Sequence, residues 1–228
     1  MNPPQVFVRV KIVCLIACKL FIYLNEYFFY FAAPAEINED PKCNADFGFV
    51  ADVSKSVENH WDDEKTFIRK LVRSIAISEQ GGRAAVTSFS NLAELQIKFS
   101  DHLSYLTFET ALEAIPYVGS TTRINLGLEV ALEEMFQEYN GMRSGVPQTM
   151  VLITDGQQLE VDFNLFREQF NKAGIRTIVI GVGNVRESEL RHLVNDDADF
   201  YKADDFNELL TDEFIKSITF CGGRLLFV

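Results

Sequence analysis

The stretch Phe47-Gly48-Phe49-Val50-Ala51-Asp52-Val53-Ser54-Lys55-Ser56 decides how this chain folds. Its first five residues form a short apolar run, which is typical of a buried strand in a parallel sheet. A carboxylate and two hydroxyls follow at alternate positions where the strand ends: Asp52, Ser54 and Ser56. All three side chains offer oxygen, the donor that hard cations prefer. The end of this strand is therefore a candidate cation site that needs further ligands from elsewhere in the chain.

Strand and helix patterns alternate after this stretch. Apolar runs predict strands over residues 83–89, 149–154, 175–180 and 200–201. Helical periodicity predicts helices over residues 61–79, 105–115, 122–136, 163–172, 187–194 and 205–218. Residues 94–99 alternate apolar and polar side chains, which predicts a half-exposed strand paired antiparallel at the sheet edge. Because helices separate the other strands, we expect parallel crossovers and a doubly wound α/β sheet.

Two other segments bring oxygen donors to the same edge of this sheet. Thr122 opens a predicted helix, and Asp155 follows the predicted strand at residues 149–154. In a doubly wound sheet, the loops at the carboxyl ends of the two strands at the reversal point lie side by side. We expect those strands to be the ones that end at Asp52 and Thr154. The predicted ligands are Asp52, Ser54, Ser56, Thr122 and Asp155.

The chemistry of these ligands limits the ion. Hydroxyls and carboxylates suit Mg²⁺, Mn²⁺ or Ca²⁺, whereas zinc would favour His and Cys. Two carboxylates leave positive charge on the ion and an exchangeable water, so an acidic side chain of a partner could complete the coordination. Each signal alone has a local explanation, since Ser and Asp cap helices and Asp-Gly forms turns. All of them together, each at a strand or helix end, favour the cation site.

At these residues the chain resembles the von Willebrand factor type A family. Its metal-ion-dependent adhesion site combines Asp-x-Ser-x-Ser, a Thr in a Gly-rich loop and an Asp in a Thr-Asp-Gly turn, and all five positions match. The resemblance covers about residues 43–221 and implies a Rossmann-like, three-layer α/β/α fold with an antiparallel edge strand. It also implies Mg²⁺ (or Mn²⁺ or Ca²⁺) held directly by Ser54, Ser56 and Thr122. Asp52 and Asp155 would act through water.

The resemblance further implies a function. The domain would be a non-enzymatic adhesion module that binds a protein ligand presenting Asp or Glu, such as collagen or another matrix protein. Ser120 and Ile124 depart from the usual family pattern without removing a ligand, so they leave the specificity for the partner open. An intracellular or purely architectural module of the same family remains an alternative.

Two other classes fit less well. A haloacid dehalogenase-type Mg²⁺ phosphatase would place an acid/base carboxylate two residues after Asp52, where this chain has Ser54. The formal net charge of -12 and the lack of a basic stripe argue against nucleic-acid binding, which depends on Lys and Arg at the phosphate backbone.

The length of 228 residues and the 47% hydrophobic content predict one domain with a leader. Residues 1–35 combine early basic residues with an apolar run and late small residues, which is typical of a secretory signal. An uncleaved signal anchor and a wrongly assigned first exon are the alternatives. Residues 36–42 form a polar linker, residues 43–221 the domain and residues 222–228 a tail. We expect a secreted matrix protein, or a membrane-anchored one if the signal stays attached.

Two cysteines bracket the predicted domain. Cys43 precedes the first strand and Cys221 follows the last predicted helix. We expect them to form a disulfide, which would stabilise the domain by ~5 kcal/mol on the chain-entropy account. Two free thiols are the alternative, and the redox state of the native protein distinguishes an extracellular from an intracellular assignment.

Overall fold

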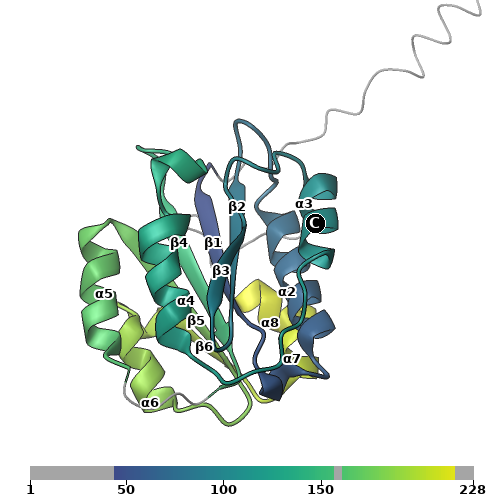
Figure 1. Cartoon of the computed structure of the whole chain (residues 1–228), viewed down its shortest axis with the longest axis vertical. Helices are drawn as coiled ribbons and strands as arrows, with labels where there is room; N and C mark the ends of the chain where they lie inside the picture. Colours follow the sequence, from purple (N-terminus) through teal and green to yellow (C-terminus); the bar gives the residue numbers. More distant parts are fainter. Residues whose placement is uncertain (1–43, 157–160, 219–228) are drawn as a thin grey trace, which may run out of the picture. The chain divides into compact units, whose positions relative to one another are not determined.

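The computed structural model describes residues 44–156 and 161–218, and these contain a six-stranded sheet (Figure 1). The strand order is β3-β2-β1-β4-β5-β6. Every neighbouring pair is parallel except β2 and β3, which are antiparallel. The strands are β1 (Asp46–Asp52), β2 (Arg83–Phe89), β3 (Ala93–Ile97), β4 (Gln148–Thr154), β5 (Ile175–Val182) and β6 (Phe200–Ala203). The predicted doubly wound α/β fold with an antiparallel edge strand is confirmed.

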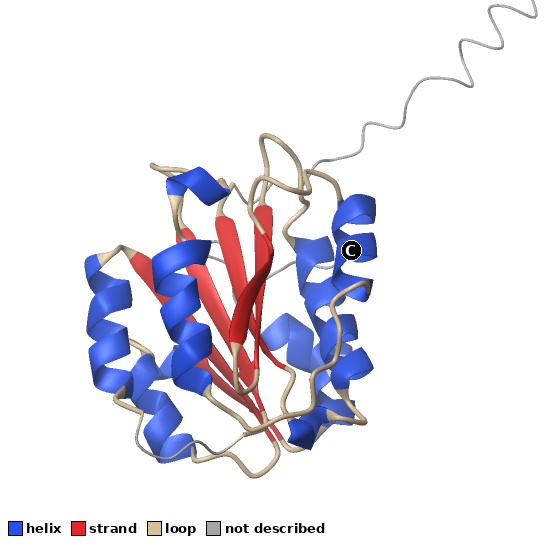
Figure 2. Cartoon of the chain, in the orientation of Figure 1, coloured by secondary structure: helices blue, strands red, loops and turns tan. Residues whose placement is uncertain are grey.

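Helices cover both faces of the sheet (Figure 2). One face carries α2 (Trp61–Ser74), α3 (Tyr105–Glu113), α7 (Phe206–Leu209) and α8 (Asp212–Ser217). The other carries α4 (Ile124–Val130), the π-helical turn η2 (Ala131–Met135), α5 (Phe163–Lys172) and α6 (Glu187–Leu190). Single 3-10 turns lie at η1 (Lys55–Val57), η3 (Glu138–Asn140), η4 (Arg191–Leu193) and η5 (Asp197–Asp199).

Strand β1 lies at the centre and contributes to both hydrophobic cores. Phe47 and Phe49 pack into the core beneath α2, while Val50 packs into the core beneath α4. Gly48 lies against η2, where an added Cβ would be 2.2 Å from the sulfur of Met135. The glycine therefore lets the π-helical turn lie close against the strand. The alternation of side chains between the two faces explains why the whole strand is buried.

An ion pair with a buried carboxylate holds the start of β1. The carboxylate of Asp46 is fully buried and accepts hydrogen bonds from the main-chain N of Arg143 at 2.7 Å and from its Nε at 2.8 Å. The Nη2 atom of Arg143 lies 2.6 Å from Oδ1 of Asp46. Because the guanidinium binds the carboxylate through two nitrogens, the loop before β4 is joined to the first strand.

Several predicted helix boundaries were wrong. Helix α2 ends at Ser74 rather than at residue 79, because the chain turns at Ala76, which has a left-handed φ of 49°. The helix predicted from residue 122 begins at Ile124 and passes into the π-helical turn η2. The helix predicted over residues 205–218 is divided into α7 and α8, since the side chain of Thr211 caps a new helix by accepting from the N of Phe214.

The predictions for the chain termini and the disulfide concern residues outside the described part: 1–35, 36–42, Cys43, Cys221 and 222–228. Within residues 44–156 and 161–218, no helix has both the length and the apolar character needed to cross a bilayer.

Candidate metal centre

Strands β1 and β4 are neighbours and end at the same edge of the sheet. Ala51 pairs with Ile153, so Asp52 and Thr154 lie side by side at the next position. The carboxylate of Asp52 is fully buried, and its Oδ2 accepts a 2.7 Å hydrogen bond from the hydroxyl of Thr154. Its Oδ1 accepts from the main-chain N of Ser54 at 2.9 Å. These two bonds fix the orientation of the Asp52 carboxylate at the carboxyl end of β1.

Hydroxyls from the other predicted segments extend this network. Oγ1 of Thr122 lies 3.0 Å from Oγ of Ser54, which in turn lies 3.1 Å from Oγ of Ser56. The hydroxyl of Ser56 donates to Oδ1 of Asp155 at 2.6 Å. The structure thus brings all five predicted residues into one cluster of oxygens. Asp52 and Ser54 are buried whereas Ser56 is exposed, so the cluster opens to solvent at one end.

Backbone contacts bring Thr122 to the end of β1. The main-chain N of Gly119 donates to the carbonyl of Val53 at 2.9 Å, and the N of Lys55 donates to the carbonyl of Ser120 at 2.7 Å. Gly119 has a φ of 71°, a left-handed conformation that glycine adopts without strain. The segment before α4 is therefore bound to the segment after β1 by main-chain hydrogen bonds.

Gly156 closes the cluster on the β4 side. Its main-chain N donates to the hydroxyl of Thr154 at 3.0 Å. A Cβ added at this position would lie 2.5 Å from Cγ2 of Thr122 and 3.3 Å from Oδ2 of Asp52. Only glycine fits here without moving the Thr122 side chain, so this residue sets how closely the β4 loop approaches the other two segments.

Burial perturbs both carboxylates of the cluster. It raises the pKa of Asp52 from 3.8 to about 6, although hydrogen bonds from Ser54 and Thr154 oppose the shift. Burial also raises the pKa of Asp155, against the effect of its hydrogen bond from Ser56. No Lys or Arg among the described residues forms an ion pair with either carboxylate. Two partly or fully buried carboxylates without a Lys or Arg partner favour a bound positive charge.

Glu64 is a third acidic residue at this site, and it was not predicted from the sequence. It lies in the first turns of α2, is fully buried, and accepts a 3.0 Å hydrogen bond from the main-chain N of Asp52 through Oε1. A signal was present in the sequence, because Glu64 precedes Phe67, Ile68 and Leu71 at the spacing of the apolar face of this helix.

The donor set suits a hard divalent ion. Three hydroxyls and two carboxylates are oxygen ligands, which Mg²⁺, Mn²⁺ and Ca²⁺ prefer. In the part of the chain that the structure describes, no group of three or more His, Cys, Asp or Glu side chains has the arrangement of a metal site. The candidate metal centre is the cluster of three hydroxyls and two carboxylates described above.

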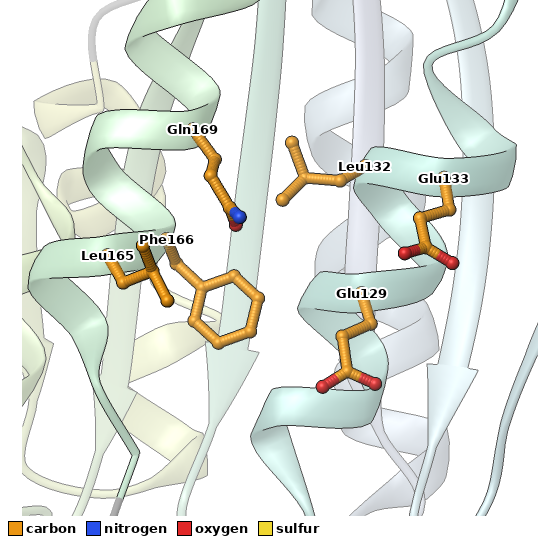
Figure 3. Close-up of a pocket in the computed structure, with 6 residues that line it drawn as sticks. All are labelled: Glu129, Leu132, Glu133, Leu165, Phe166 and Gln169. Atoms are coloured by element: carbon orange, nitrogen blue, oxygen red, sulfur yellow. The ribbon is translucent and has the colours of Figure 1, made fainter.

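A groove lies elsewhere, between α5 and the segment formed by α4 and η2 (Figure 3). Its volume is about 360 Å³. The side chains that line it are Glu129, Leu132, Glu133, Leu165, Phe166 and Gln169. None of these side chains belongs to the oxygen cluster, so the groove is separate from the candidate metal centre.

Comparisons with known proteins identify relatives of this chain. The family model described as von Willebrand factor type A domain matches residues 46–216. Matrilin-1 of Gallus gallus is 26% identical over 163 residues, which cover 70% of this chain and 33% of that protein. Vitrin of Mus musculus is 25% identical over 159 residues, which cover 68% of this chain and 24% of that protein. The chain thus spans a third or less of the length of these two relatives.

A solved structure from the mussel byssus is also similar. It is proximal thread matrix protein 1 "with zinc occupied MIDAS motif", with 25% sequence identity and a TM-score of 0.68. The match covers 76% of this chain and 44% of that chain. This relative shares the fold, and by the words of its title its MIDAS motif holds zinc, a divalent metal.

Proposed function

The chain belongs to the von Willebrand factor type A domain family, and from that premise we propose that it is a cation-dependent adhesion module of the extracellular matrix. The observation that carries this proposal is the hydrogen-bonded cluster of oxygens from three distant segments. Matrilin-1 and vitrin, which are similar to it over most of the chain, support the assignment to this class of protein.

The proposed ligands are those in the oxygen cluster. Ser54, Ser56 and Thr122 hold the cation directly through their hydroxyls, and Asp52 and Asp155 hold it through water. The two carboxylates have no Lys or Arg partner among the described residues, which supports this role, because a bound cation would offset the cost of their burial. Mg²⁺ is the proposed ion, with Mn²⁺ or Ca²⁺ as substitutes, since the donors are hydroxyls and carboxylates.

The proposed partner is a protein that presents Asp or Glu, such as collagen or another matrix protein. A bound divalent cation supplies a positive centre that an acidic side chain can ligate. Among the described residues, two carboxylates belong to the cluster, and the exposed Ser56 leaves one side of the cluster open to solvent. The role of the domain is binding rather than catalysis, because Ser54 occupies the position where a phosphatase of the alternative class would need a carboxylate.

The remaining parts of the proposal concern the chain around the domain. Residues 1–35 act as a secretory signal, Cys43 pairs with Cys221 and the protein is secreted into the matrix. Attachment to a membrane follows only if the signal remains as an anchor. The similar mussel protein is a matrix protein by its name, proximal thread matrix protein 1, which supports this compartment.

A binding assay tests the proposal. The chain is applied to immobilised collagen and to a native matrix extract, with either Mg²⁺ or EDTA present. We expect binding in Mg²⁺ that is lost in EDTA and in Thr122→Ala, but retained in Glu133→Ala, which removes an exposed carboxylate in the separate groove. If the chain binds the cation but its binding to the matrix is the same in EDTA, the result would instead favour the architectural alternative.

The role of the partner's acidic group is tested with a small carboxylate. Mn²⁺ is loaded into the domain, and the relaxation of water protons is measured while acetate is added. We expect acetate to displace water from the protein-bound ion and to inhibit matrix binding over the same concentration range. Matrix binding that is insensitive to acetate, although acetate displaces the water, would contradict completion of the site by an acidic residue.

A further inference from the structure

Glu64 occupies an unusual position for a carboxylate. In α2 it lies on the same face as Phe67, Ile68 and Leu71, which are all fully buried in the core. Glu64 itself is fully buried, and its Oε2 has no hydrogen-bond partner among the described residues. A polar atom buried without a partner destabilises the folded state, and an apolar side chain at this position would avoid that cost.

The other oxygen of Glu64 does have a specific contact. Oε1 accepts a 3.0 Å hydrogen bond from the main-chain N of Asp52, the last residue of β1. The carboxylate of the same Asp52 is oriented by Ser54 and Thr154. Asp52 is thus held from both sides: its main chain by a side chain from α2, and its carboxylate by the loop after β1 and the end of β4.

We propose that Glu64 is a positioning residue for the cation site, which holds the main chain of Asp52 in place so that its carboxylate stays aligned with the hydroxyls of Ser54 and Thr122. The inference rests on the proposed function of that site. It explains why a carboxyl group stands on an apolar helix face: the contact with Asp52 serves cation binding, at a cost to the stability of the fold.

A positioning role differs from a structural role in a measurable way. Loss of a structural residue lowers the stability and the cation affinity together. Replacement of Glu64 by an apolar side chain of similar volume should instead leave the stability unchanged or raise it, because the unpaired buried oxygen is removed. The same replacement should weaken cation binding, because the amide of Asp52 loses its acceptor.

The test compares Glu64→Leu and Glu64→Gln in the full chain. Calorimetry gives the Kd for Mg²⁺ at a single pH near 7, and circular dichroism gives the thermal midpoint in EDTA. We expect Glu64→Leu to raise the Kd for Mg²⁺ about fivefold or more, which corresponds to about 1 kcal/mol, with a thermal midpoint equal to or above that of the wild type. Glu64→Gln keeps an oxygen that can accept from Asp52, so its Kd should stay within about twofold of the wild-type value.

Three results would overturn the inference. They are a wild-type Kd in Glu64→Leu, a Kd in Glu64→Gln as weak as in Glu64→Leu, and a parallel loss of stability and affinity in Glu64→Leu. Glu64→Met serves as a second apolar variant if the Leu variant does not fold, and the same criteria apply to it. Absence of a Mg²⁺ heat in the wild type would overturn the proposed function itself, whereas a wild-type heat that Glu64→Leu retains overturns this inference alone.

Discussion

The hydroxyl of Ser56 donates a 2.6 Å hydrogen bond to Oδ1 of Asp155, although the two residues are 99 positions apart in the chain. This contact joins the loop after β1 to the loop after β4, the two central neighbours in the sheet. It lies at the point where the winding of the sheet reverses, which is where doubly wound folds place their ligands. Because both residues belong to the oxygen cluster, substitutions in the cluster test the proposed site.

Substitution Asp155→Ala should abolish measurable Mg²⁺ binding, because the cluster loses one of its two carboxylates. Calorimetric titration with Mg²⁺ should give a heat for the wild type and none for the variant. Glu133→Ala is the matched control, since it removes an exposed carboxylate from the groove between α4 and α5 and should titrate like the wild type. Equal heats for the wild type and Asp155→Ala would end the metal-site hypothesis.

The stability of the cation-free protein should fall as the pH rises from 4 to 7. The pKa of Asp52 is about 6 in the folded state and 3.8 in the reference state, so the folded protein binds more protons between these values. The contribution of Asp52 to the free energy of unfolding should therefore be highest below pH 4 and should decrease as the pH rises through 6. The decrease should amount to about 3 kcal/mol. Thermal unfolding in EDTA across this range measures it.

Two controls isolate the contribution of Asp52 to this pH dependence. In Asp52→Asn the group no longer titrates, so the slope between pH 4 and pH 6 should be smaller than in the wild type. Mg²⁺ should stabilise the wild type at pH 7 more than at pH 5, because protons compete with the cation at the Asp52 carboxylate. Identical slopes for the wild type and Asp52→Asn would show that another group determines the pH dependence.

Substitution Gly156→Ala should weaken Mg²⁺ binding about tenfold, or by about 1.4 kcal/mol. The added Cβ would lie 2.5 Å from Cγ2 of Thr122, so the Thr122 side chain has to move and its hydroxyl leaves the cluster. Gly145→Ala is the control. Gly145 has a φ of 83°, and a Cβ added there would have no atom within 4 Å apart from those of its chain neighbours. This substitution should therefore cost about 1–2 kcal/mol of stability through its backbone conformation, without changing the Kd for Mg²⁺. The prediction is wrong if Gly156→Ala binds Mg²⁺ as the wild type does.

Substitution Asp46→Ala should destabilise the fold by about 3–5 kcal/mol, because the partly buried guanidinium of Arg143 loses its carboxylate partner. For a domain of this size the thermal midpoint should fall by roughly 10 °C. Glu189→Ala removes the exposed ion pair with Arg186 and should cost less than about 1 kcal/mol. Comparable losses in the two variants would show that the burial of the Asp46 pair is not what stabilises the start of β1.

The local sequence predicted most of the strands because their signals are local. The run that ends at Asp52 and the strand over residues 83–89 were recognised from apolar composition and length, and the antiparallel edge strand from its alternation. The five oxygen-bearing residues were found because each stands at the end of a strand or helix, where side chains of a doubly wound sheet converge. Their role as metal ligands stays a prediction.

The helix ends were predicted less well, because tertiary contacts and single backbone conformations set them. The left-handed Ala76 ends the turn that follows α2, and a cap by Thr211 divides the last helical segment. The π-helical turn η2 lies against Gly48 of β1, a contact between residues more than 80 positions apart. Nothing in the local periodicity of these segments indicates such contacts.

The sequence alone determined the order of strands and helices and the identity of the oxygen donors, because apolar periodicity and residue chemistry are properties of the chain itself. Only the tertiary structure decided how these atoms bond to one another and which further groups join them. Glu64 shows the difference: its spacing placed it on a buried helix face, but its contact with the amide of Asp52 depends on how α2 packs against the end of β1. Packing of distant segments, which local sequence does not encode, brings that acceptor to the site.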